Sequence, residues 1–487
     1  MNEKPQTIRL FVFKILHDKQ HSCRIKCSMD GFSSFFAILM LCAGLFLTVR
    51  INFFQFTHLG CAIKTALGLG QRRSARSKQK FDASGVTPFQ ALSSALGGSI
   101  GTANIAGVAS AIAIGGAGAV FYMWLAALVG MGVKFCEIVL ALRYREKRGG
   151  QWCGGAMLYI EKGFRKSNTG SRFLQSVSKP LAAGFALFGL LASSVGTPLV
   201  QSNTIAMSVN DAVLLFLPKA EQKTVCIIAG AVTAALVGIV ILGGIQRIGK
   251  ASEIIVPFMA IGYIAICIIV LSRFGSRILP AFRDIFSGAL GIKQAVGGAA
   301  GFGAARALRI GMARGVYSNE AGVGSAPMAH ACANTNDPVK QGMYGIFEVF
   351  ADTIVMCTMT ALVVLASGIP LQAGGEISGT SIALRAFSTV LPERTTGIFL
   401  AVSMLLFAYT SLLGWAVYGM QCAKYLFGKR AQLPFCILYT VLTFAGALMK
   451  VDFVWTAGET LNYLMAAPNM LALLVLNREV RRETAFA

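Results

Sequence analysis

The chain of 487 residues is 55% hydrophobic and only 13% charged, with a mean hydropathy of +0.64. A soluble globular domain carries about a quarter charged residues, so this composition excludes an ordinary water-soluble protein. The net charge of +23 does not indicate nucleic acid as a partner, because the Lys and Arg lie mostly between apolar segments and no nucleic-acid-binding motif is present. We therefore expect the chain to lie in a lipid bilayer.

Eleven apolar segments predict membrane-spanning helices, because each is long enough to cross a hydrocarbon core of about 30 Å. The first is too long and too late for a secretory signal, so we expect it to remain as a helix. It follows a basic tail, in which Cys23 and Cys27 with His17 and His21 could bind a metal, although a solvated tail is the commoner explanation. The predicted spans are 31–50, 87–114, 117–142, 180–209, 224–245, 251–272, 292–333, 343–367, 396–423, 433–449 and 453–476.

The distribution of Lys and Arg predicts the orientation of these spans. If the first span ends in the cytoplasm, the loops on that side carry more than twice as many Lys and Arg as the opposite loops. Basic loops stay on the cytoplasmic side, so we expect a bacterial inner-membrane protein with a cytoplasmic C-terminus. The basic tail before Met29 disagrees, since it would lie outside. Either the later loops outweigh this tail, or the first segment does not span the membrane.

Two matching glycine clusters predict where the helices are interrupted. Residues 95–104 (ALGGSIGTAN) and 295–304 (AVGGAAGFGA) share the pattern A-x-G-G-x-x-G, and they open the first and sixth of the ten helices after the leading one. Glycine costs about 1 kcal/mol relative to alanine inside a helix. Glycine-interrupted helices at matching positions of two halves are typical of inverted-repeat transporters. The alternative is a pair of small-residue faces that pack helices closely.

The pattern thus predicts an all-α polytopic membrane protein with 11 transmembrane helices. We expect a basic N-terminal tail over 1–29 and an extra first helix with a basic cytoplasmic loop over 30–85. A first inverted repeat of five core helices follows over 86–272, and a second over 273–477. A cytoplasmic tail occupies 478–487.

An interrupted helix can bind a zwitterionic amino acid in the middle of the membrane. Free N–H groups and the positive end of a half-helix suit the carboxylate, whereas freed carbonyls suit the ammonium group or a sodium ion. Phe302, between two glycines of the second cluster, is expected to close the pocket. The first interruption supplies the other residues: Ser99, Gly101, Thr102, Ala103 and Asn104.

Other polar residues lie inside apolar segments, where they are costly unless they are paired or functional. Gln201 and Asn203 lie in the third core helix, and Thr410, Ser411 and Trp415 lie in the eighth. Ser411 and Trp415 are four residues apart and share a helix face. A Ser or Thr in a membrane helix more often bonds a carbonyl of its own helix than an ion, so these residues alone leave a sodium site open.

Charged residues inside the apolar segments need partners as well. Lys134 and Glu137, three residues apart in the second core helix, are predicted to pair with each other. Glu348 and Asp352 share a face of the seventh core helix. Either could relay a proton, although a hydrogen-bonded structural carboxylate is the commoner role. Glu320 is expected to cap or brace the sixth helix.

The motifs argue against a membrane enzyme. HExxH does not occur, the only GxSxG (97–101) lies within the first glycine cluster, and only His58 and His330 lie outside the N-terminal tail. We therefore expect a secondary transporter that has no cofactor besides a coupling ion. A channel or a non-transporting sensor built from the same helices is the alternative that the residues leave open.

Six stretches also carry a resemblance: 87–116 (TPFQALSSALGGSIGTANIAGVASAIAIGG), 130–145 (GMGVKFCEIVLALRYR), 313–331 (ARGVYSNEAGVGSAPMAHA), 352–368 (DTIVMCTMTALVVLASG), 411–428 (SLLGWAVYGMQCAKYLFG) and 461–476 (LNYLMAAPNMLALLVL). Their motifs GTxNIAGVA and SNEAGxGSAPxAHA are long and rarely occur together by chance. On these stretches the chain resembles the alanine or glycine:cation symporter family, also called the sodium:alanine symporters. The resemblance covers nearly all of the chain after residue 86.

The resemblance implies a leucine-transporter-like fold of five-plus-five inverted repeats preceded by one extra helix. It also implies symport of alanine or glycine with Na+, or alternatively with H+. The implied substrate shell is Ser99, Gly101, Thr102, Ala103, Asn104, Gln201, Phe302 and Trp415. The implied sodium ligands are Thr410 and Ser411 beside carbonyls near Gly97 and Ile100. Closed by two aromatic rings, the pocket should favour a very short side chain.

The chain departs from the family pattern at several positions. Ala103 stands where the family usually has Gly, and Ala117 stands where it has Pro. The extra methyl group of Ala103, next to the substrate backbone, is expected to narrow the pocket or to shift its selectivity. In the eighth core helix Val417, Met420 and Gln421 stand where the family commonly shows a Tyr and a Glu-Arg pair. This loss of charge puts the gating contacts and the coupling ion in doubt.

Overall fold

The computed structural model describes residues 38–69, 85–166, 172–291, 300–370, 379–449 and 451–485, without the side chains of 300–302, 451–457 and 459. The basic tail with Cys23 and Cys27, residues 31–37 of the predicted first span and residues 295–299 of the second glycine cluster lie outside the described residues. Within the described ranges the chain is almost entirely helical, and its one sheet is a two-stranded hairpin.

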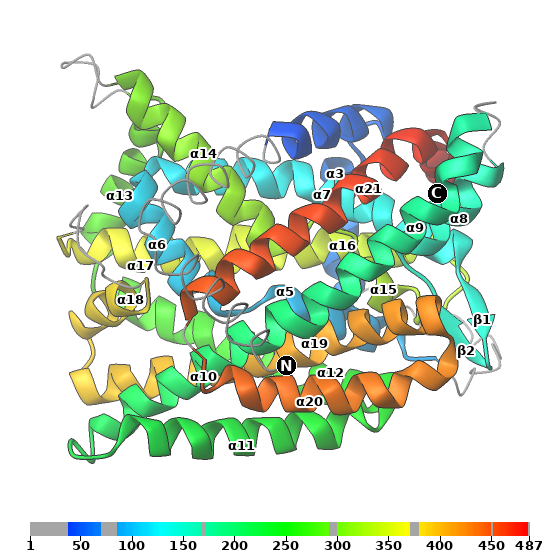
Figure 1. The fold of residues 1–487 in the computed structure, drawn as a ribbon. Coiled ribbons are helices and arrows are strands. Elements are labelled where there is room, and N and C mark those ends of the chain that lie inside the picture. Colours follow the sequence, from blue (N-terminus) through cyan, green and yellow to red (C-terminus); the bar gives the residue numbers. More distant parts are fainter. Residues whose placement is uncertain are drawn as a thin grey trace, which may run out of the picture.

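The first half of the chain forms the elements drawn from blue to green in Figure 1. A helix over Ile38–Arg50 leads, and the antiparallel hairpin follows α7. The elements are α3 (Phe54–Thr57), α4 (Leu59–Ala66), α5 (Pro88–Ser99), η1 (Thr102–Asn104), α6 (Ala106–Gly115), α7 (Gly118–Tyr144), β1 (Glu146–Arg148), β2 (Gln151–Cys153), α8 (Ala156–Lys166), α9 (Arg172–Leu191), η2 (Ala192–Gly196), α10 (Thr197–Leu214), α11 (Gln222–Ile241), α12 (Gly244–Ser272) and α13 (Gly275–Ala289).

The second half continues from light green to red in Figure 1. Its elements are α14 (Ala300–Asn319), α15 (Ala326–His330), α16 (Pro338–Val349), η4 (Phe350–Cys357), α17 (Thr358–Ser367), α18 (Gly379–Ser388), α19 (Glu393–Phe427), η5 (Lys429–Ala431), α20 (Gln432–Gly446) and α21 (Val451–Ala485). Two π-helical stretches, η2 and η4, join α9 to α10 and α16 to α17 without ending the helix. Such stretches inside long helices often lie near functional sites.

Local sequence explains where the key helices begin and end. Thr87 and Gln90 form a capping box at the start of α5, and Pro88 occupies its first turn, where no N–H partner is lost. Asp337 accepts from the backbone N–H of Lys340 at the start of α16. Gly368 ends α17 in the left-handed conformation that glycine adopts without strain.

Seven helices in the described ranges are long and apolar enough to cross a membrane: α7, the joined α9–α10, α11, α12, the joined α16–α17, α19 and residues Thr460–Ala485 of α21. The most apolar part of α7 is 89% buried, whereas that of α12 is only 33% buried. α7 therefore lies at the centre of the bundle. α11 and α12 turn large apolar side chains outward, as lipid-facing helices do, among them Ile228, Ile239, Ile254 and Phe258.

These helices cover most of the predicted spans. The predicted spans 87–114 and 292–333 correspond to the helix pairs α5–α6 and α14–α15, and 433–449 corresponds to the shorter α20. The helix over Ile38–Arg50 covers only part of the first span, so the count of eleven stays a prediction. α13 and α18, which lie between predicted spans, are helices that the hydropathy pattern did not predict.

Candidate functional site

The first core helix is interrupted where the first glycine cluster predicts it. α5 ends at Ser99, and Ile100 and Gly101 have extended backbone before the single turn η1. The helix restarts only at Ala106. The last carbonyls of α5 and the first N–H groups of α6 therefore lack partners inside their own helices. The side-chain oxygen of Asn104 accepts from the N–H of Gly101 at 2.9 Å and fixes the loop between them.

The second interruption lies at a different place from the predicted one. α14 is helical from residue 300 to 319, so the described part of the second glycine cluster is helix. The chain breaks at 320–325 instead, where Glu320, Gly322 and Gly324 have φ values of 53°, 85° and 84°. Glycine only weakens a helix, by about 1 kcal/mol, whereas left-handed residues end it. The predicted interruption at 295–304 is wrong for the residues that are described.

The two interrupted helices cross in opposite directions. α5 packs against α15, and α6 packs against α14, so the first half of each helix contacts the second half of the other. The turn η1 contacts both the end of α14 and η4. The amide nitrogen of Asn104 donates to Asp352 Oδ1 at 2.7 Å and lies 3.2 Å from Ser318 Oγ. The interruptions therefore meet inside the bundle.

The glycines of the second interruption also make room for neighbouring side chains. A Cβ on Gly322 would lie 1.9 Å from Met40 Cε, and a Cβ on Gly324 would lie 2.8 Å from Phe185 Cε2. Atoms cannot approach so closely, so a side chain at either position would force its neighbour to shift, and the positive φ adds strain for any residue except glycine. The leading helix, which carries Met40, thus packs directly against this interruption.

A small cavity opens on the first interruption, between α5, α10, α14, α19 and α21. Six of the predicted site residues line it: Ser99, Gly101, Ala103, Gln201, Ser411 and Trp415. Four further polar residues, which were not predicted as pocket residues, line it too: Thr197, Tyr317, Glu320 and Asn462. The cavity combines the backbone of an interrupted helix with an amide, a carboxylate and aromatic rings.

Polar contacts hold the walls of this cavity. Gln201 Oε1 accepts from the hydroxyl of Thr102 at 3.4 Å, which brings the α10 side chain beside the interruption. The indole N–H of Trp415 donates to Glu320 Oε1 at 2.8 Å, and the hydroxyl of Ser325 donates to Glu320 Oε2 at 2.6 Å. Glu320 therefore braces the second interruption, as expected, and also ties it to α19.

Two described residues of the predicted shell, Thr102 and Asn104, do not line the cavity. Asn104 is fully buried and is turned toward Asp352. Phe302 precedes Tyr317 by 15 positions on α14, which is about 22 Å along a helix. Its side chain lies outside the described part of the chain. Tyr317 supplies the aromatic ring that α14 contributes to the cavity.

The predicted sodium ligands lie together where α5 and α19 touch. A Cβ on Gly97 would lie 3.2 Å from Thr410 Cβ, and the hydroxyl of Ser411 donates to the carbonyl of Gly98 at 3.2 Å. Ile100 is fully buried at the end of α5. The Thr410 hydroxyl lies 3.1 Å from the carbonyls of Leu406 and Phe407. Hydroxyls beside the end of a helix form an oxygen-rich set of the kind that a hard cation prefers.

Lys134 does not pair with Glu137, contrary to the prediction. Its ammonium nitrogen lies 3.1 Å from Glu348 Oε1, and both side chains are fully buried. Glu137 Oε1 instead accepts from the N–H of Gly324 at 3.0 Å and from the amide of Asn469 at 2.6 Å. Spacing along one helix did not identify either partner.

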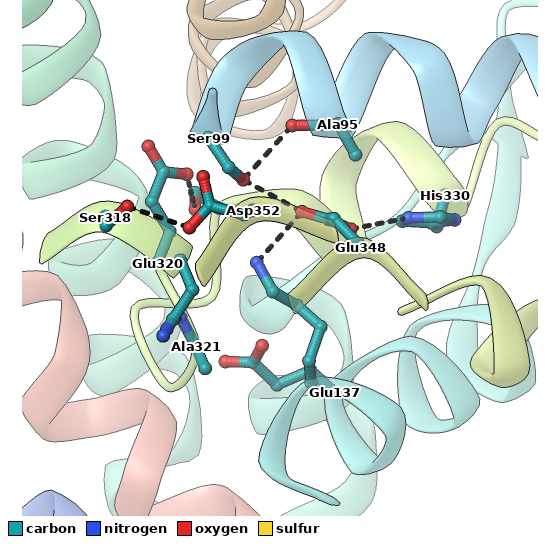
Figure 2. Close-up of polar contacts among 12 residues, drawn as sticks. Ala95, Ser99, Glu137, Ser318, Glu320, Ala321, His330, Glu348 and Asp352 are labelled. Atoms are coloured by element: carbon teal, nitrogen blue, oxygen red, sulfur yellow. Dashed lines mark hydrogen bonds and ion pairs between the residues drawn. The ribbon is translucent and has the colours of Figure 1, made fainter. Parts of the chain in front are cut away.

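Glu348 and Asp352 belong to separate hydrogen-bond networks, although they are four residues apart. Asp352 Oδ2 accepts from the hydroxyls of Ser318 and Thr353, each at 2.8 Å. Glu348 contacts Ser99 and His330 (Figure 2). Both carboxylates are fully buried and hydrogen-bonded. A proton relay through either one stays a prediction.

Three of the residues that depart from the family pattern lie near the C-terminal end of α19. Val417, Met420 and Gln421 line a second small cavity beside β2. The Gln421 amide nitrogen lies 2.9 Å from the sulfur of Cys332, which follows α15, and 3.4 Å from the carbonyl of Trp152. An uncharged contact therefore joins α19 to the hairpin and to the second interrupted helix.

The chain is similar to known transport proteins over nearly its whole length. The model of the sodium:alanine symporter family matches residues 25–485. The sodium/alanine symporter AgcS of Methanococcus maripaludis is 39% identical over 451 residues, which is 92% of each chain. The probable sodium/glutamine symporter GlnT of Bacillus subtilis is 34% identical over 92% of this chain and 86% of its own.

One similar solved structure is that of MhsT in complex with L-phenylalanine. It has 13% sequence identity and a TM-score of 0.46, over 82% of this chain and 97% of its own. The family match spans nearly the whole chain, and the relatives are transporters that cover it almost from end to end. The chain belongs to the sodium:alanine symporter family, and it is a multi-pass membrane protein that acts as a secondary amino-acid transporter.

Proposed function

We propose that this transporter couples the uptake of a small neutral amino acid, alanine or glycine, to sodium by alternating access. The observation that carries the proposal is the cavity at the first interruption, where the non-helical backbone of Gly101 lies beside Gln201 and Trp415. An isolated charge costs several kcal/mol when it leaves water without a partner. A zwitterion needs partners for both of its charges, and helix ends provide them.

The substrate is proposed to lie among Ser99, Gly101, Ala103, Gln201 and Trp415. The N–H groups at the start of α6 face its carboxylate, and the carbonyls at the end of α5 face its ammonium group. The methyl group of Ala103 and the rings of Tyr317 and Trp415 leave room only for a short side chain. Phe302, Thr102 and Asn104 remain proposed members of the substrate shell, and the family resemblance is the support for them.

Sodium is proposed to bind between α5 and α19. Its ligands would be the hydroxyls of Thr410 and Ser411 with the carbonyls of Gly97 and Ile100. An ion here joins an interrupted helix to an uninterrupted one. Sodium binding would therefore stabilise the arrangement in which Ser411 and Trp415 face the interruption, and this is how coupling arises.

The same proposal places the protein in a bacterial inner membrane with its C-terminus in the cytoplasm, in agreement with the excess of Lys and Arg in the loops of that side. It retains 11 spans and five-plus-five inverted repeats over 86–272 and 273–477. The opposite crossing of α5–α6 and α14–α15 supports the inverted relation between the repeats.

Uptake by purified protein in liposomes tests the proposal. We expect labelled alanine or glycine to accumulate only with an inward sodium gradient, and an excess of either unlabelled amino acid to compete. Uptake that follows a pH gradient and ignores sodium would support proton coupling instead. Ion currents without substrate, or binding without flux, would indicate a channel or a sensor.

Replacing Ala103 with leucine should abolish alanine binding while the fold remains intact. The residue lines the small cavity, so a longer side chain would occupy the substrate's place. Ala103→Gly restores the residue typical of the family and is expected to bind alanine. Binding is measured by calorimetry in sodium buffer, with the thermal midpoint as the measure of folding. Alanine binding by the leucine variant would remove position 103 from the pocket.

Ser411→Ala should raise the sodium concentration for half-maximal uptake by about tenfold, since a bond from a neutral group to a charge contributes about 1.5 kcal/mol or more. Thr410→Ala should act in the same way. Ser403→Ala, two turns earlier on α19, is the matched control and is expected to keep the wild-type sodium dependence. If all three variants show the same sodium dependence, sodium binds elsewhere.

A further inference from the structure

Glu348 lies outside the cavity, yet it contacts three other elements. Its Oε1 accepts from the hydroxyl of Ser99, at the end of α5, at 2.9 Å and pairs with Lys134 of α7 at 3.1 Å. Its Oε2 lies 3.2 Å from His330 Nε2, at the end of α15. Figure 2 shows these contacts converging on one carboxylate. Glu348, Lys134 and His330 are all fully buried.

The polar contacts of Glu348 are two hydrogen bonds that it accepts, from Ser99 and His330, and one ion pair with Lys134. Gln341 Nε2 lies 2.8 Å from His330 Nδ1 and 3.5 Å from the carbonyl of Pro88, so the amide donates on that side. With Nδ1 as acceptor, the proton of a neutral imidazole is on Nε2 and points to Glu348. Ser99 and His330 therefore both donate to the same carboxylate, and Lys134 forms an ion pair with it.

Stability alone does not explain this arrangement. A buried ion pair can often be replaced by apolar residues of similar volume without loss of stability. An apolar pair in place of Lys134 and Glu348 would not, however, join Ser99 to His330. These two residues end α5 and α15, which come from different halves of the chain and pack against each other.

We propose that Glu348 is a positioning residue of the transport cycle, which holds α5 and α15 together as one unit. This inference rests on the proposed transport function. Ser99 lines the cavity on the side that Glu348 holds, whereas Gln201 and Trp415 line it from α10 and α19. When the cavity opens, the linked half-helices move together relative to α10 and α19.

Two double variants separate the link from the ion pair. Lys134→Met with Glu348→Gln removes both charges but keeps an amide that can accept from Ser99 and donate to His330. An amide that donates to His330 Nε2 requires the imidazole proton to be on Nδ1, which faces Gln341. Gln341 Oε1 has no partner among the described residues, so the side-chain amide of Gln341 can rotate and accept this proton. Lys134→Met with Glu348→Met removes the charges and the link together.

The measurements are sodium-dependent alanine binding in detergent and alanine uptake in proteoliposomes. We expect both variants to bind alanine within about threefold of each other. The glutamine variant should transport within a few-fold of the wild-type rate, and the methionine variant should be slower by about tenfold or more, because it loses both of the buried hydrogen bonds that the glutamine keeps. Equal uptake rates, or binding and uptake that fall in proportion, would overturn the inference.

A third variant covers the case in which the double variants do not accumulate in the membrane. His330→Phe keeps a ring in α15 and leaves the pair of Lys134 and Glu348 intact, but it breaks the link. It should bind alanine and transport it slowly, and wild-type turnover would overturn the inference. Absence of uptake by the unaltered protein would contradict the proposed function, whereas equal rates among the variants would contradict only the role of Glu348.

Discussion

Gly414→Val is expected to abolish sodium-driven uptake. A Cβ on Gly414 would lie 2.6 Å from Gly98 Cα and 2.8 Å from the carbonyl oxygen of Ser94. These are backbone atoms, which cannot move aside as a flexible side chain can, so α5 and α19 would have to separate. The contact of Ser411 with Gly98 would then be lost. Overpacking costs about 1–3 kcal/mol, and the upper value corresponds to roughly a hundredfold loss of the packed arrangement.

Gly262→Val is the matched control for this substitution. Gly262 lies in α12, and a Cβ there would have no atom within 4 Å. We expect normal membrane accumulation and normal uptake for this variant. Retained sodium-driven uptake by Gly414→Val would show that α5 and α19 need not pack this closely, and it would remove the reason for placing sodium between them.

Trp415→Ala is expected to weaken alanine binding by about 1–3 kcal/mol, the scale of one buried aromatic contact. The Trp415 side chain lines the cavity and is only 3% exposed. Its loss also leaves the buried carboxylate of Glu320 without one of its donors. Removal of a buried Trp costs about 3–5 kcal/mol of folding stability, so the thermal midpoint should fall as well.

Trp415→Phe separates these two effects. It keeps a ring in the cavity and removes only the bond to Glu320, so alanine affinity should fall less than in the alanine variant. The larger pocket of Trp415→Ala should also admit longer neutral amino acids. Alanine affinity and substrate competition are measured by calorimetry and uptake. Unchanged affinity in Trp415→Ala would place the substrate away from this ring.

The sequence predicted the first interruption but not the second, and the difference is physical. At the first, Gly97, Gly98 and Gly101 lie next to the break itself. The second glycine cluster has the same pattern, yet its described residues are helical because glycine lowers helix stability without forbidding the helix. The second interruption could have been predicted from Gly322 and Gly324, which are followed by Pro327. Glycines before a proline are typical of a place where one helix ends and another begins.

Partners far apart in the sequence were beyond what spacing can predict. Lys134 and Glu137 are neighbours on one helix face, but Lys134 pairs with Glu348, more than 200 residues away. Tyr317 and Asn462 likewise line the cavity from α14 and α21, which are far from α5 in the sequence. The family motifs identified the residues around the first interruption, and six of the twelve predicted site residues line the cavity together.

The close contact of Met40 with Gly322 has a consequence for how such chains vary. The leading helix stands outside the two proposed repeats, yet it forms part of the wall behind one of the interruptions. Side-chain volume at position 40 and backbone shape at position 322 are therefore bound by a single steric limit. In chains of this kind a residue other than glycine at position 322 should therefore be accompanied by a shorter side chain at position 40.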